Sequence, residues 1–67
     1  MLIKKSITIK KHRTSLSLEK EFWNALKFIS KERHSSIENL ITEIDTNRKA
    51  SLASSIRVYV LNYYMKN

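Results

Sequence analysis

Polar and apolar residues alternate along residues 13–18, where Leu16 and Leu18 are separated by a polar position. Because strand side chains point alternately to opposite faces, the two leucines share one face of a strand. The opposite face is polar and contains Arg13, Ser15 and Ser17. This is the strongest strand pattern in the chain, and we expect it to be the single strand of each chain.

Residues 1–11 carry a weaker pattern, because their β-branched residues alternate imperfectly with polar ones. A hairpin with residues 13–18 is an alternative, but its turn at residues 10–12 contains none of the Gly, Asn or Asp that tight hairpin turns prefer. We therefore interpret residues 1–11 as an extended basic arm and residues 12–67 as the folded domain.

Helical spacing begins at Lys20 and predicts a first helix that ends near His34. Its apolar stripe consists of Phe22, Ala25, Leu26 and Ile29, flanked by Trp23 and Phe28. Trp23 is expected in the core or at a subunit interface. A second helix follows Ser36, a good N-cap, and breaks at residues 45–47. Its stripe consists of Ile37, Leu40, Ile41 and Ile44.

A third helix is expected after the N-cap residue Ser51, with two apolar stripes on nearly opposite sides. The first stripe consists of Leu52, Ile56, Tyr59 and Tyr63, and the second of Val58, Leu61 and Met65. Such a helix is usually buried on two sides, so we expect it to join subunits as well as to cover the core. The β-formers of residues 56–64 leave a strand as an alternative.

A chain with one strand cannot satisfy its own backbone hydrogen bonds, and 67 residues bury little apolar surface alone. The chain has no cysteine, so a disulfide framework is excluded and oligomerisation is the remedy that stays open. We expect a homodimer in which the strands of two chains pair. The residues predicted for the dimer core are Leu16, Leu18, Phe22, Trp23, Leu26, Ile29, Leu40, Ile41 and Ile44.

Residues 1–18 contain five basic residues and no acid, although the whole chain has a net charge of only +7. A concentrated basic segment indicates an anionic partner, which charge alone does not identify as nucleic acid, anionic lipid or acidic protein. The candidate phosphate contacts in this segment are Lys4, Lys5, Lys10, Lys11 and His12. No apolar run approaches a membrane span and no signal peptide is recognisable, so the expected location is the cytoplasm, without membrane contact.

Several blocks, taken in order, resemble the ribbon-helix-helix family of DNA-binding proteins, the Arc/MetJ class. Residues 12–19 read His-Arg-Thr-Ser-Leu-Ser-Leu-Glu and are followed by Phe22-Trp23. This motif is similar to that of one bacterial subgroup, in which His-Arg-Thr-Ser-Val-Ser-Leu-Glu precedes Phe-Trp. Later blocks of the same signature are Glu43-Ile44-Asp45, residues 52–57 and Val60-Leu61.

The resemblance implies an intertwined homodimer whose two-stranded antiparallel ribbon enters the major groove of DNA. Carried over by position, the base-contacting residues are Arg13, Ser15 and Ser17. The start of the second helix, here Ser36, Ile37 and Glu38, meets a phosphate through backbone N–H groups. The forked donors of Arg13 match guanine O6 and N7. Ser17 has a rival role as the cap of the first helix. Related chains often have glycine where this chain has His34.

The sequence therefore predicts a mainly α fold with one strand per chain, a ribbon-helix-helix domain and an additional C-terminal helix. We expect a repressor-like, sequence-specific binder of double-stranded DNA that forms homodimers and has no catalytic residues, metal or cofactor. One alternative is an antitoxin that uses the third helix to bind a toxin. Another is a basic adaptor that binds a protein or a membrane surface.

Overall fold

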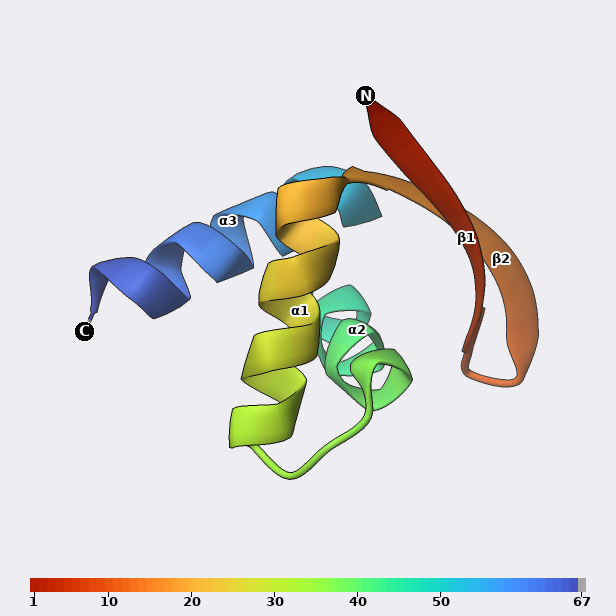
Figure 1. Cartoon of the computed structure of the whole chain (residues 1–67). Helices are drawn as coiled ribbons and strands as arrows, with labels where there is room; N and C mark the ends of the chain where they lie inside the picture. The colour runs from red at the N-terminus through yellow and green to blue at the C-terminus, as the bar shows by residue number, and fades with distance from the viewer. Residues whose placement is uncertain (67) are drawn as a thin grey trace.

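The computed structural model describes residues 1–66, which form a hairpin of two strands followed by three helices (Figure 1). The elements are β1 (Leu2–Ile9), β2 (His12–Glu19), α1 (Lys20–Glu32), α2 (Ile37–Asn47) and α3 (Leu52–Met65). In Figure 1 the long, curved hairpin lies beside the α1–α2 pair, and α3 crosses behind α1 towards the opposite side. No helix of residues 1–66 has the length and apolar character needed to cross a membrane.

The strand β1 corrects the expectation of an extended arm and of a single strand in each chain. β1 and β2 are antiparallel along their whole length, from the pair Leu2 and Glu19 to the pair Ile9 and His12. Ile7 and Ile9 are buried, so this segment contributes to the core instead of waiting for a partner. The hairpin that the sequence left as an alternative is the one that forms.

The turn of the hairpin is built from Lys10 and Lys11, which have φ angles of 51° and 69°. Two consecutive residues in the left-handed conformation between paired strands form a type I′ turn, whose twist matches that of the flanking strands. This turn ordinarily contains Asn-Gly. Lysine has a Cβ atom and pays a steric cost in this region. The buried isoleucines on β1 favour pairing strongly enough to hold the turn closed. The missing turn signal explains why the sequence favoured an arm.

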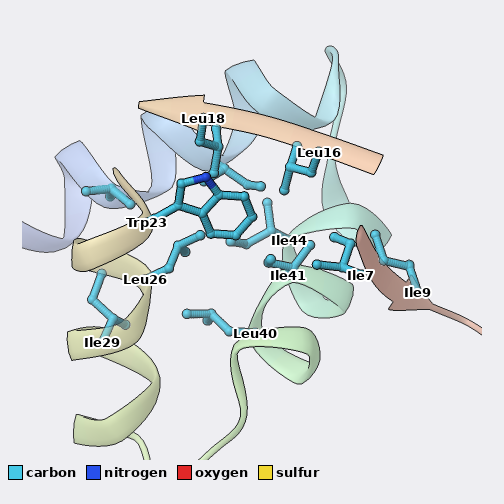
Figure 2. Close-up of a cluster of buried hydrophobic side chains, with 12 residues drawn as sticks. Ile7, Ile9, Leu16, Leu18, Trp23, Leu26, Ile29, Leu40, Ile41 and Ile44 are labelled. Carbon is cyan, nitrogen blue, oxygen red and sulfur yellow. The ribbon is translucent and has the colours of Figure 1, made fainter. Parts of the chain in front are cut away.

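The inward face of the hairpin packs against α1 and α2 and forms the core (Figure 2). Eight of the nine residues predicted for a dimer core are already buried within one chain, and Phe22 is half-buried. Core residues outside that prediction are Ile7, Ile9, Ile56 and Val60. Within the described residues, these side chains therefore build the core of the single chain, and any role in a shared core stays a prediction.

The end of α1 uses a histidine in the place where glycine is usual. His34 has a φ of 54°, its N–H donates to the Lys31 carbonyl at 3.1 Å, and the Ser35 N–H donates to the Ser30 carbonyl at 2.8 Å. These two bonds satisfy carbonyls that the helix end leaves free, as in a Schellman motif. The chain thus reverses direction towards α2 without glycine.

Serine side chains begin the other two helices, as predicted. The Ser36 hydroxyl accepts from the Asn39 N–H at 3.0 Å, and the Ser51 hydroxyl accepts from the Ser54 N–H at 3.2 Å. The Ser17 alternative is wrong, because Ser17 lies within β2 and Glu19 holds the N-cap position of α1. The predicted break at residues 45–47 is also wrong, since α2 continues through Asn47.

The helix α3 is buried on only one side. Ile56 and Val60 enter the core, whereas Val58, Leu61 and Met65 are 54%, 54% and 79% exposed. The structure confirms a helix rather than a strand over residues 56–64. The second apolar stripe therefore lies open on the surface of the single chain.

Replacing the turn by Lys10→Asn with Lys11→Gly is expected to raise the free energy of unfolding by about 1 kcal/mol, because it relieves the left-handed lysines. Urea unfolding at fixed protein concentration measures this change. The control pair Lys10→Gln with Lys11→Gln removes the same charge but keeps the Cβ atoms, and it should leave the midpoint nearly unchanged. If both double variants gain the same free energy of unfolding, the effect comes from the loss of positive charge and not from the turn conformation.

Candidate nucleic-acid interface

The outward face of the hairpin carries six polar side chains in three cross-strand pairs. The pairing register places Thr8 opposite Arg13, Ser6 opposite Ser15 and Lys4 opposite Ser17. All six lie on the face opposite the buried isoleucines and leucines, because strand side chains alternate. Arg13 and Ser15 are exposed and Ser17 is half-buried. The three predicted base-contacting residues therefore share one face.

Half of this polar face comes from β1, which was expected to be an extended arm. Ser6 and Thr8 were not among the predicted site residues. The available signal was the short alternation Ser6-Ile7-Thr8-Ile9, which places these two polar side chains on the face opposite the isoleucines. A second row of polar groups thus runs beside the predicted one.

Thr8 is held by two hydrogen bonds of different kinds. Its hydroxyl oxygen accepts from Arg13 Nη1 at 3.2 Å, across the two strands. Its backbone N–H donates to Glu38 Oε2, at the start of α2, at 2.8 Å. The tip of the hairpin is therefore tied to the first turn of α2, and Arg13 is tied to β1.

The predicted phosphate-contacting lysines do not all lie on one surface. Lys4 belongs to the outward face, and Lys10 and Lys11 form the exposed turn. Lys5 lies on the other face, with Nζ 5.1 Å from the centre of the Trp23 ring. Lys5 therefore contributes to packing over the indole.

Trp23 lies in the core, one of the two places predicted for it. It is 5% exposed, and its Nε1–H donates to the Ile3 carbonyl at 2.8 Å. This bond fixes the first half of β1 to α1 and satisfies the buried indole nitrogen.

The start of α2 is less suited to a phosphate than the resemblance implies. Like any helix N-terminus, this end of α2 presents backbone N–H groups that suit an anion. Ser36 is exposed there and Ile37 is half-buried. However, the Glu38 carboxylate lies in the same first turn and already accepts the Thr8 N–H. A phosphate here would meet a negative charge.

A groove of about 560 Å³ runs along β2. Consecutive residues Thr14, Ser15, Leu16 and Ser17 line it, together with Arg48 and Leu52. Residues from both faces of a strand line one groove only along the strand's edge. This groove therefore follows the edge of β2 that β1 leaves unpaired, and His12 lies at its end.

An ion pair anchors the end of β2 to α3. Arg57 donates from Nε and Nη2 to the two carboxylate oxygens of Glu19, both at 3.0 Å. These hydrogen bonds lower the pKa of Glu19 below its ordinary value. Asp45 has other partners: it accepts from Arg48 Nε at 2.7 Å, and Lys10 Nζ lies 3.8 Å from its carboxylate.

A match to the model of a family called ribbon-helix-helix domain covers residues 2–64, which is nearly the whole chain. The chain belongs to the ribbon-helix-helix family. No curated protein and no solved structure matches it. In residues 1–66, no three His, Asp or Glu side chains are grouped closely enough to hold a metal ion.

The Glu19 pKa is expected to rise towards its ordinary value in Arg57→Met, because that variant removes the donors that favour the carboxylate. An NMR titration of the Glu19 side chain measures the change. Since the folded pKa is lowered, the pair contributes stability above the unfolded pKa and loses it as the pH falls through the folded value. An unchanged pKa in Arg57→Met would contradict this assignment.

Proposed function

We propose that this ribbon-helix-helix protein is a homodimeric, sequence-specific DNA-binding regulator of the repressor type. The observation that carries the proposal is the polar outward face of the hairpin, on which Arg13, Ser15 and Ser17 lie together. The net charge of the first 18 residues, with five bases and no acid, supports an anionic partner. Family membership supports double-stranded DNA as that partner.

The unpaired edge of β2 supports the dimer. In an antiparallel pair, residues alternate between those that exchange hydrogen bonds and those that do not. Ile9 and His12 close the two-residue turn, so counting from them places the backbone groups of Arg13, Ser15 and Ser17 on the unpaired edge. A second copy that pairs there satisfies those groups and fills the groove along β2. Two hairpins then form one four-stranded sheet.

The dimensions of such a sheet divide its strands between two roles. The major groove is about 12 Å wide and admits a two-stranded ribbon. Strands lie about 4.8 Å apart, so the two β1 strands of a four-stranded sheet are separated by about 14 Å. The central β2 strands then face base edges, while the β1 strands lie near the phosphates that border the groove. Lys4 and the turn residues Lys10 and Lys11 supply charge there.

Discrimination between sequences depends chiefly on Arg13. Its planar fork of donors matches guanine O6 and N7, whereas the short hydroxyls of Ser15 and Ser17 accommodate several bases. Affinity comes largely from lysines that neutralise phosphates, so binding weakens steeply as salt increases.

A second candidate function is an antitoxin whose α3 binds a toxin. It is favoured by the exposed stripe Val58, Leu61 and Met65, beside which Phe28 and Tyr64 stack with their centroids 6.4 Å apart. Removing α3 does not test this function, because Ile56 and Val60 belong to the core. Changing Leu61 and Met65 to serine removes the stripe alone. If this double variant loses toxin binding and keeps DNA binding, the antitoxin function is favoured. The remaining alternative, a basic adaptor that binds a protein or a membrane surface, predicts that the wild type does not bind DNA.

Arg13→Ala is expected to weaken binding to a duplex obtained by unbiased selection by about 1–3 kcal/mol, with a much smaller effect on random duplex. Fluorescence anisotropy at two salt concentrations measures both affinities. Lys31→Ala, on the exposed side of α1, removes one positive charge away from the hairpin and is the matched control. Equal loss on both duplexes would remove the base-reading role of Arg13, and no salt-sensitive binding by the wild type would reject the proposed function.

Ser15→Pro is expected to give a folded monomer, because proline removes an N–H from the unpaired edge of β2 while leaving the bonds to β1 in place. Light scattering coupled to chromatography gives the mass, and circular dichroism reports the fold. Ser15→Ala keeps the N–H and should remain a dimer. A wild-type protein that is monomeric at micromolar concentration would contradict the proposed assembly.

A further inference from the structure

Arg13 has a long, flexible side chain on an exposed face, so its usefulness as a base reader depends on how it is oriented. An exposed arginine samples many rotamers, and fixing them on binding costs free energy. In this structure Arg13 Nη1 already donates to the Thr8 hydroxyl at 3.2 Å, from the directly opposite position on β1. One end of the guanidinium is thus fixed before any ligand arrives.

The backbone of Thr8 is bound to α2 as well as to the hairpin. Its residue is paired with β2 on one side, while its N–H on the other side donates to Glu38 Oε2 at 2.8 Å. Glu38 lies in the first turn of α2, and the buried face of that helix lies in the core. The Glu38 bond therefore holds the Thr8 backbone to α2 through a contact that does not involve Arg13.

We propose that Thr8 is a positioning residue for Arg13, and that Glu38 holds Thr8 in place. This inference rests on the proposed DNA-binding function and assigns β1 a part in specificity. The bond occupies Nη1, while Arg13 keeps its Nε and Nη2 donors for a base edge. The Thr8 hydroxyl also keeps its own hydrogen for a second acceptor.

The Glu38 carboxylate, in the first turn of α2, binds the hairpin through the Thr8 N–H. Acting as an acceptor for the edge of β1, it ties that strand to the helix, in a place where the family resemblance implies a phosphate. The inference therefore predicts that Glu38→Gln, which keeps an acceptor, changes specificity less than Glu38→Ala.

The test is Thr8→Val, which removes the hydroxyl but keeps the branched shape that suits a strand and the backbone N–H that binds Glu38. Affinity for the selected duplex is expected to fall about five-fold, the size typical of losing one hydrogen bond with a net value of about 1 kcal/mol, while affinity for random duplex stays unchanged. The loss should concentrate at the base pair where Arg13→Ala also loses discrimination, as measured with duplexes changed at one position at a time.

Three controls separate positioning from a general structural effect. Thr8→Ser restores the hydroxyl and should recover most of the affinity, while Ser6→Ala removes a hydroxyl from the same face of the same strand and should not change that base preference. In an Arg13→Ala background, Thr8→Val should have no further effect on specific binding. In the free protein, the NMR relaxation of the Arg13 Nε–H group should report greater mobility in Thr8→Val.

The possible failures are distinguishable. If the wild type binds the selected duplex and Thr8→Val binds it equally well or more tightly, the positioning role is rejected and the proposed function stands. If Thr8→Val and Ser6→Ala lose the same affinity at all positions, the effect is not positioning. If the wild type binds no duplex, the proposed function fails and this inference fails with it.

Discussion

The pairing of β1 with β2 is the interaction on which the rest of this structure depends. It buries Ile7 and Ile9, places the Trp23 indole under the start of β1 and sets Thr8 opposite Arg13. The pairing is closed by two lysines in left-handed conformations, which a local preference would not select. Burial of the isoleucines thus outweighs an unfavourable turn, and the same turn exposes two positive charges at the hairpin tip.

β2 pairs with β1 of the same chain, so a dimer is not needed to give this strand its first partner. A lone strand would need a partner for any stable fold, whereas β2 has one satisfied edge and one that lines a groove. Within residues 1–66, the single chain also buries a core of twelve apolar residues without a partner. The proposed dimer therefore serves to complete a reading surface and to cover a strand edge, which is a liability when left open.

The three helices act mainly as a support for the hairpin. Ion pairs tie its two ends to the helices, Glu19 to Arg57 on α3 and Lys10 to Asp45 on α2. Arg33 joins the helices to one another, since it donates to both Glu43 and Tyr59. These contacts are at least partly exposed to solvent, so each contributes little stability alone. Together they link the hairpin to the helices and the helices to one another.

The sequence by itself determined the family, the three helices, the serine caps and the face shared by Arg13, Ser15 and Ser17, because periodicity and capping are local properties. It also indicated that His34 occupies a glycine position. Only the tertiary structure decided that residues 2–9 form a strand, that Lys5 lies over Trp23, and that Thr8 and Glu38 meet beside Arg13. Those outcomes depend on contacts between residues up to 30 positions apart, and on core burial that overrides a poor turn sequence. No local pattern contains that information.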